Sequence, residues 1–268
     1  VLVDSDQRRA WAEATDLQHS LGVSGSAMDV RAGSYYDCAD ADVCVLTAGP
    51  QFPPNTPRLD KLDQTATLVG RVVPSIMATG FDGIFLVVTN PVDLMTWLVQ
   101  QLSGLPDTRV IGTGTALDTA RLRCYLADAL AVDPRSVTAF VMGVAGKPLD
   151  QVFEDHPDLL PGFDRDAVAN TIADVTYNLA GVKGTTTFGV SSVAAEILTA
   201  ILRDEQRVLP VSAMLHGEYG QEGVYAGVPA VVGASGIREV VEYRLTDEEQ
   251  AQFGRAVRVL HEYTTSIS

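Results

Sequence analysis

Asp118 and Arg121 stand three positions apart, and they are the first residues of this sequence whose types could do chemistry together. On a helix, that spacing puts both side chains on one face. They could form a surface ion pair worth about 0.3–0.5 kcal/mol. They could instead form a working pair, in which Arg121 grips a carboxylate through two parallel hydrogen bonds and Asp118 orients an imidazole. The neighbouring motifs favour the working pair.

Arg58 offers a further positive charge. It follows the proline-rich segment 51–57, and a guanidinium carried by a loop can close over a bound anion and polarise a carbonyl group. The alternative is an ordinary surface arginine at the start of a helix, where the helix dipole slightly disfavours a positive charge.

Small and polar residues follow two strand-like runs. Thr47, Ala48 and Gly49 end one run, and Thr89-Asn90-Pro91 ends the next. Ligands of open α/β sheets bind outside the carboxyl ends of the strands. Small residues there would let a ring approach the backbone, and the Asn90 amide would hold a carboxamide or a hydroxyl group. Each motif taken alone is also ordinary turn chemistry.

Asp4 ends the first strand-like run. In a dinucleotide-binding fold, an acid at this place accepts hydrogen bonds from ribose hydroxyls and so favours NAD over NADP. The other interpretation is a helix N-cap. The glycine-rich turn that should precede such an acid by about 20 residues is absent from the sequence. Gly112-Thr-Gly114 does not replace it, because Leu117 stands at the third glycine position.

The elements that must position these residues alternate in the first half of the chain. Continuous apolar runs, as expected of strands buried on both faces, alternate with helical patterns, which predicts a parallel sheet covered by helices. The expected strands are 1–3, 43–47, 84–88, 110–111 and 137–142, and the expected helices are 6–20, 59–78, 91–102 and 116–131. After about residue 146 a second, α+β layer is expected, with helices at 164–181, 187–203 and 247–263 and strands at 208–215, 223–232 and 240–243.

The composition is that of an ordinary globular protein, with 268 residues of which 46% are hydrophobic and 20% charged. A net charge of −15 argues against nucleic acid or an anionic membrane surface as a partner. Three cysteines and four histidines show neither a disulfide framework nor metal-ligand spacing, so we expect no metal and a reducing, cytoplasmic location. No apolar run is long enough to span a membrane. Because the chain starts at Val1, we expect further residues upstream, and the missing signal peptide says little.

Read in order, these motifs resemble the L-lactate/malate dehydrogenase family over nearly the whole chain. The segment Gly112–Arg121 is close to the family's most specific signature, and Asn90–Asp93 matches the asparagine that meets nicotinamide and substrate. The further matching segments are Leu2–Asp4, Asp16–His19, Thr47–Arg58, Lys183–Thr186, Leu209–Ser212, Gly217–Gly220 and Val228–Gly233.

The resemblance implies an α/β fold, with a Rossmann-type doubly wound parallel sheet in a dinucleotide-binding domain over residues 1–143 and an α+β substrate domain over residues 144–268. It implies NAD as cofactor, a small 2-hydroxy or 2-oxo acid as substrate, and a homodimer or homotetramer. The implied site residues are Arg121 as carboxylate anchor, Arg58 as carbonyl polariser, Asn90 at the reacting centre, Thr186 in the substrate pocket, and Asp4, Thr47, Ala48 and Gly49 beside the cofactor.

The sequence departs from the family pattern in three places. The family's first strand and glycine loop are absent, which amounts to roughly one βα unit of about 30 residues, and we expect them to precede Val1. The family's G-E-H-G-D reads Gly143-Val-Ala-Gly-Lys147, so Ala145 stands where the catalytic histidine belongs. Phe52 aligns with the residue that reads the substrate side chain, so an apolar substituent is favoured over a second carboxylate.

Ala145 can neither give nor take a proton, and losing general acid/base catalysis slows a reaction by about 10²–10⁴-fold. The leading hypothesis is an NAD-dependent dehydrogenase of a small L-2-hydroxy acid, lactate-like or apolar, with an engineered or natural change at this position. A second hypothesis is a catalytically inactive homologue that binds the nicotinamide cofactor or a 2-oxo acid. A third is another reaction on the same scaffold with its own proton donor. Lys147 could replace the base only with a pKa lower by about three.

Overall fold

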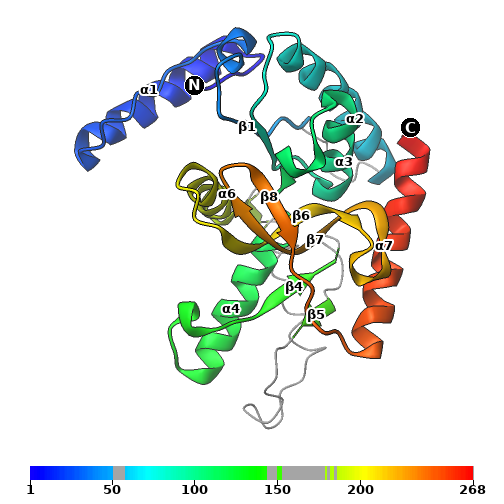
Figure 1. The fold of residues 1–268 in the computed structure, drawn as a ribbon. Helices are drawn as coiled ribbons and strands as arrows, with labels where there is room; N and C mark the ends of the chain where they lie inside the picture. Colours follow the sequence, from blue (N-terminus) through cyan, green and yellow to red (C-terminus); the bar gives the residue numbers. More distant parts are fainter. Residues whose placement is uncertain (51–57, 144–149, 153–178, 180–181, 184–185, 268) are drawn as a thin grey trace.

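The computed structural model describes residues 1–50, 58–143, 150–152, 179, 182–183 and 186–267 (Figure 1). Its strands form a six-stranded sheet in the order β1-β2-β3-β6-β7-β8 and a two-stranded sheet of β4 and β5. The strands are β1 (Val43–Leu46), β2 (Ile84–Val87), β3 (Val110–Gly112), β4 (Phe140–Met142), β5 (Asp150–Val152), β6 (Arg207–His216), β7 (Glu222–Gly233) and β8 (Gly236–Val240). The helices are α1 (Gln7–Ser24), α2 (Arg58–Met77), α3 (Val92–Ser103), α4 (Ala116–Leu130), α6 (Thr187–Leu202) and α7 (Asp247–Ile267), with the short helices η1 (Tyr35–Cys38), η2 (Asp107–Arg109), η3 (Pro134–Ser136) and η5 (Glu218–Gly220).

Strands from both halves of the chain share the large sheet. β1, β2 and β3 are parallel, with Val45 opposite Leu86 and Leu86 opposite Ile111. β3 is antiparallel to β6 through one pair, Gly112 with Ser212, and β6, β7 and β8 are antiparallel to one another. The predicted Rossmann-type α/β fold is confirmed, and the structure adds that strands of the second half extend the same sheet. The division of the chain after residue 143 stays a prediction.

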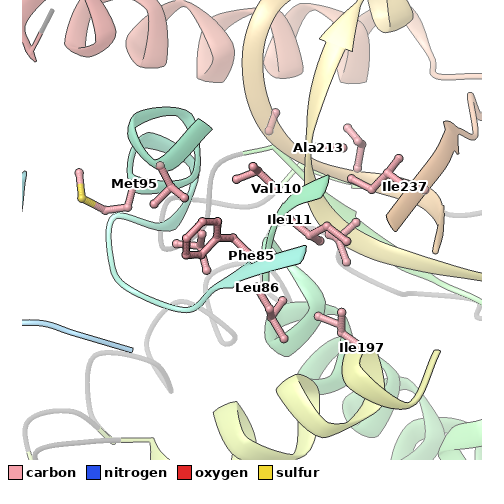
Figure 2. Close-up of a cluster of buried hydrophobic side chains, with 14 of the residues drawn as sticks. Phe85, Leu86, Met95, Val110, Ile111, Ile197, Ala213 and Ile237 are labelled. Atoms are coloured by element: carbon pink, nitrogen blue, oxygen red, sulfur yellow. The ribbon is translucent and has the colours of Figure 1, made fainter. Parts of the chain in front are cut away.

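The core lies on both faces of β2 and β3. All four residues of β2 are buried, as its uninterrupted apolar sequence predicted. Successive side chains of a strand point to opposite faces, so Phe85 lies on the side of Met95 in α3, whereas Leu86 lies on the side of Ile197 in α6 (Figure 2). Helices therefore cover both faces of the parallel strands.

Two strands near the ends of the parallel part are shorter than predicted. Residues 1–3 form only a bridge, in which Leu2 pairs with Ala32 outside the large sheet. β4 begins at Phe140 rather than at residue 137. Residues 134–136 turn as η3 from an Asp133 cap and a proline in the first turn, and the Val137 N–H still donates to the Pro134 carbonyl of that turn at 3.2 Å. The helix predicted at 164–181 lies outside the described residues except for its member at 179.

The strand predicted at 240–243 is wrong. β8 instead starts at Gly236, which pairs with Gly233 across a tight turn. Gly236 has a φ of +96°, and a Cβ added there would lie 2.0 Å from the carbonyl oxygen of Thr108. This turn therefore requires glycine. A capping box precedes α7, since Thr246 and Glu249 each accept a hydrogen bond from the other's backbone N–H, at 3.2 and 2.8 Å.

Candidate active site

Two of the predicted site loops lie against each other at the carboxyl ends of β1 and β2. The Thr89 hydroxyl donates to the carbonyl oxygen of Ala48 at 2.7 Å and approaches that of Leu46 at 3.2 Å. The buried Thr89 side chain thus holds the segment Thr47–Gly49 beside Asn90. Sequence reasoning had placed Thr89 in the strand-end motif without giving it this role.

The residues on either side of this contact are open to solvent. Asn90 is exposed, and its amide makes no hydrogen bond to the part of the chain that the structure describes. A Cβ built on Gly49 would meet no atom within 4 Å. A flat group could therefore approach the backbone at Gly49 without a steric clash, with the Asn90 amide available as a donor and an acceptor.

The Asp118–Arg121 pair follows β3 at the same edge, on the first turns of α4. Nη1 of Arg121 donates to Oδ1 of Asp118 at 2.8 Å, and the two side chains are only 15% and 10% exposed. The pair is therefore not the solvent-exposed bridge that the spacing alone allowed. Burial raises the pKa of Asp118 above its ordinary value, although Arg121 pulls it the other way. A carboxyl group whose charge is disfavoured by its surroundings is typical of functional sites.

The end of β4 is tied to the same turn of α4. The Thr115 hydroxyl donates to the Val141 carbonyl at 2.5 Å, and the Val141 N–H donates to the Thr119 hydroxyl at 2.9 Å. Gly143 then exchanges two hydrogen bonds with Gly227, at 2.9 and 2.8 Å. These bonds hold the end of β4 and Gly143 beside the first turns of α4, whereas Ala145 and Lys147 lie outside the described residues.

α6 brings the predicted substrate residue Thr186 to α4. Thr186 precedes the first turn of α6 and is half-buried. A Cβ on Gly189, in that first turn, would lie 2.8 Å from Cδ1 of Leu117, so the two helices approach closely at their N-terminal ends. Thr186 and Asp118 are positioned by the same contact.

A buried polar contact that the sequence analysis missed joins the two halves below this edge. Ser212 of β6 donates to Oδ1 of Asp93, in the first turn of α3, at 2.7 Å. Ser212 is fully buried, and Asp93 is only 2% exposed. Both residues belong to segments that carried the family resemblance, but no spacing along the chain connects positions 119 residues apart.

Asp4 is not the N-cap of α1. The cap of α1 is Asp6, whose side chain accepts from the N–H groups of Arg8 and Arg9. Asp4 is exposed and accepts from the backbone N–H of Asp6 at 2.8 Å. Its charge also acts on Tyr35, whose pKa is raised first by burial and then by Cys38, Cys44 and Asp4. Asp4 is thus a surface carboxylate close to η1 and β1.

The remaining predicted residues are not placed. Phe52 lies outside the described residues, and of Arg58 only its position as the first residue of α2 is described. Of the histidines, His216 bonds Asp107 at 2.6 Å at the opposite edge of the sheet, and His19 and His261 lie in α1 and α7. No group of three or more potential metal ligands occurs among the described residues. Within the same residues no helix has the length and apolar character needed to cross a membrane.

Comparison with known proteins gives matches over both halves. Residues 1–112 match the family description "lactate/malate dehydrogenase, NAD binding domain", and residues 115–267 match "lactate/malate dehydrogenase, alpha/beta C-terminal domain". L-lactate dehydrogenase 3 of Bacillus cereus is 41% identical over 281 residues, which cover 100% of this chain and 89% of that protein. The aligned stretch is thus 13 positions longer than this chain, 281 against 268, so that relative has residues with no counterpart here.

Solved structures agree. The minor L-lactate dehydrogenase from Enterococcus mundtii, in a ligands-bound form, superposes with a TM-score of 0.95 at 38% identity, covering 100% of this chain and 89% of that one. The malate dehydrogenase from Aeropyrum pernix gives a TM-score of 0.90 at 30% identity, covering 99% of this chain and 89% of that one. The chain therefore belongs to the lactate/malate dehydrogenase family, and its first half is an NAD-binding domain of that family.

Proposed function

We propose that this chain is an NAD-dependent dehydrogenase of the lactate type, acting on a small L-2-hydroxy or 2-oxo acid with a methyl-like or larger apolar side chain. The observation that carries the proposal is the buried Asp118–Arg121 pair, at 2.8 Å, beside the carboxyl ends of the parallel strands. Taking two charges out of water is costly, and a buried pair is weak evidence for stability. A ligand carboxylate is the better reason for a buried arginine at this edge.

The residues at the edge fit the cofactor. The space above Gly49 is open, and Thr89 holds Ala48 beside Asn90, so the nicotinamide end has a flat backbone surface and an amide. Asp4 is exposed, and a different residue caps α1, which leaves the Asp4 carboxylate able to accept from ribose hydroxyls and to disfavour a 2′-phosphate. The chemistry that NAD supplies when bound is the acceptance and return of a hydride.

The substrate would lie between α4 and α6. The guanidinium fork of Arg121 would hold the carboxylate, in an orientation fixed by its bond to Asp118. Thr186, which the Gly189–Leu117 contact brings to α4, would line the pocket. The roles of Arg58 as carbonyl polariser and of Phe52 as contact for the apolar substituent are carried over from the family resemblance.

A second candidate function is binding without turnover. In this proposal Ala145 occupies the position of the proton-transferring histidine, and the described histidines 19, 216 and 261 lie elsewhere in the fold. Such a chain would keep the carboxylate and cofactor contacts and lack the step that moves the proton.

The family's homodimer or homotetramer and a cytoplasmic location belong to the same proposal. α1 exposes three large apolar residues, Trp11, Leu17 and Val23, at 65%, 49% and 92%. A second copy of the chain would cover exposed apolar side chains of this kind, and light scattering on the purified protein gives the number of copies.

Two variants separate these functions. Ala145→His restores the imidazole alone, and a chimera replaces the residues between Gly143 and Thr186 with the matching stretch of the Bacillus cereus relative, which restores any missing backbone as well. NADH consumption is followed with pyruvate, larger apolar 2-oxo acids and oxaloacetate, with NADPH in parallel. The matched control adds Arg121→Lys to each variant, which keeps the charge and removes the fork.

We expect the unaltered chain to bind NADH and pyruvate, and one of the variants to gain turnover of about 10²–10⁴-fold, with apolar acids preferred over oxaloacetate and with the gain lost in the Arg121→Lys controls. Binding of NADH and pyruvate with no turnover in any form would establish the second function. An unaltered chain that binds neither NADH nor a 2-oxo acid would contradict both.

A further inference from the structure

Ser212 lies where three segments around the candidate active site meet. Its hydroxyl donates to Oδ1 of Asp93, in the first turn of α3, at 2.7 Å. Its backbone pairs with Gly112, the last residue of β3. A Cβ built on Gly114 would lie 2.4 Å from the Ser212 backbone nitrogen, so the loop that leads into α4 packs against the same residue. One fully buried residue therefore connects β6 with the start of α3 and with the loop before α4.

The bond to Asp93 fixes the part of the chain that directly follows Asn90. Asp93 stands three residues after Asn90, and the Met95 N–H donates to the Pro91 carbonyl at 2.9 Å. The helical turn therefore starts at the carbonyl group next to Asn90. Because Ser212 holds this turn, a shift of the turn would move the Asn90 backbone and with it the exposed amide.

A second bond holds Asn90 from the other side. The Thr89 hydroxyl donates to the Ala48 carbonyl at 2.7 Å, which ties the residue before Asn90 to the strand end that carries Gly49. Asn90 thus lies between two side-chain anchors, one to the end of β1 and one to β6. The second anchor is the one that comes from the other half of the chain.

The chemistry of the second anchor suits a positioning role. Asp93 is only 2% exposed, and its carboxyl group lies at the N-terminal end of α3, where the helix dipole favours a negative charge. A hydroxyl that donates to a carboxylate makes a short, directional hydrogen bond. Two apolar side chains could fill the same space, but they would not fix how far α3 has slid along β6. Burying such polar groups is weak evidence for stability, so we look for a role in geometry.

We propose that Ser212 is a positioning residue for the 2-oxo acid, which acts through Asp93 to place Asn90 opposite Arg121. The carboxylate of the acid is held by Arg121 and its reacting end meets the Asn90 amide, so the distance between these two residues decides how well the acid binds. Ser212 itself is fully buried and touches no ligand. The identity of the ligand rests on the proposed function, whereas the placement of Asn90 by Ser212 does not.

The first test measures binding of oxamate, an analogue of pyruvate whose amide carbonyl accepts no hydride, to the full chain saturated with NADH. A small misplacement of contact groups costs up to about 10²-fold, and we expect Ser212→Ala to raise the Kd of oxamate by about 10- to 100-fold. In the Asn90→Ala background the same substitution should add less than about twofold, because a residue that acts through Asn90 has no further effect once that amide is gone. Equal effects in both backgrounds would overturn the proposal.

Val99→Ala is the matched control. Val99 is fully buried farther along α3, so the substitution leaves a cavity and lowers stability without touching the anchor of Asn90. The Kd of oxamate should stay within about twofold of that of the unaltered chain. A loss as large as that of Ser212→Ala would show that general destabilisation explains the effect. Ser212→Cys keeps the size of the side chain with a weaker donor, and it carries the same test if Ser212→Ala does not fold.

The second test needs no ligand. In a ¹H–¹⁵N spectrum of the free chain, the side-chain amide signals of Asn90 are those that disappear in Asn90→Ala. Ser212→Ala should move these signals and Val99→Ala should leave them in place. Signals that stay in place in Ser212→Ala overturn the proposal, whatever the chain binds. An unaltered chain that binds neither NADH nor oxamate overturns the proposed function and the acid as ligand, and moved Asn90 signals would then still support the placement of Asn90 by Ser212.

Discussion

The substitution Gly112→Ala tests how tightly the two halves of the chain pack against each other at the junction of β3 and β6. Gly112 ends β3 and makes the single pair with Ser212 of β6. A Cβ at Gly112 would lie 2.4 Å from Oγ1 of Thr96, 2.6 Å from Cβ of Ser212 and 3.1 Å from Cγ2 of Val92. The first two distances are shorter than van der Waals contact, so a neighbour has to move.

Neither of the two nearest neighbours can move without loss. Thr96 is fully buried, and its hydroxyl donates to the Val92 carbonyl at 2.7 Å. Ser212 is fully buried and donates to Asp93 at 2.7 Å. Overpacking a core costs about 1–3 kcal/mol, and a lost buried hydrogen bond adds about 0.5–1.5 kcal/mol. The reduced freedom of the unfolded chain offsets about 0.4–1 kcal/mol. We expect Gly112→Ala to lower the free energy of unfolding by about 1–3 kcal/mol.

Gly70→Ala is the matched control. Gly70 lies inside α2, and a Cβ there would meet nothing within 4 Å. The same substitution should therefore raise the free energy of unfolding by about 0.4–1 kcal/mol. Guanidinium chloride unfolding followed by circular dichroism gives both values, as shifts of the midpoint at unchanged slope. If Gly112→Ala is as stable as Gly70→Ala, the packing argument for the β3–β6 junction is refuted.

Two further predictions concern the polar groups near the site. Ser212→Ala removes the donor to the buried Asp93 carboxylate and should lower the free energy of unfolding by about 1.5–3 kcal/mol. The control Ser75→Ala, at an exposed position of α2, should change the free energy of unfolding by less than about 0.5 kcal/mol. Equal effects in the same denaturation assay would contradict the role of the buried contact. Asp118→Asn tests whether burial raises the pKa of Asp118 in the folded protein. The folded-state pKa then lies above the unfolded one, which is near 3.9. The protonated carboxyl group therefore stabilises the wild type at low pH, and this contribution is lost as the pH rises through the folded-state pKa. The free energy of unfolding of wild type minus that of Asp118→Asn should therefore fall from about pH 4 towards neutrality, and a difference that stays flat or rises would show that Arg121 outweighs burial.

Much of the first half of the fold could be predicted because its signals are local. The apolar runs at 84–88 and 110–111 predicted β2 and β3, and the spacing of Asp118 and Arg121 predicted their shared helix face. Both patterns depend only on the periods of strands and helices. The start of β8 at Gly236 could not be predicted in the same way, because the clash that fixes the turn at Gly236 comes from Thr108, far away in the sequence.

The candidate site divides along the same line. Strand-end motifs predicted that Ala48 and Asn90 would lie at one edge, since parallel strands have their carboxyl ends on the same side. The contacts that assemble the site are hydrogen bonds between positions 22 to 119 residues apart. Thr89 bonds Ala48, Thr115 and Thr119 tie β4 to α4, and Ser212 bonds Asp93. No repeat or spacing encodes such a partner.

The amino-acid sequence by itself determined the order of the elements, the family, and the identities of the residues that could hold a carboxylate and a nicotinamide cofactor, because these are properties of residue type and short-range period. Only the tertiary structure decided that the Asp118–Arg121 pair is buried rather than solvated, and that both halves share one sheet. Burial and contact are set by what packs from elsewhere in the chain, and a residue's own neighbours in sequence do not determine them.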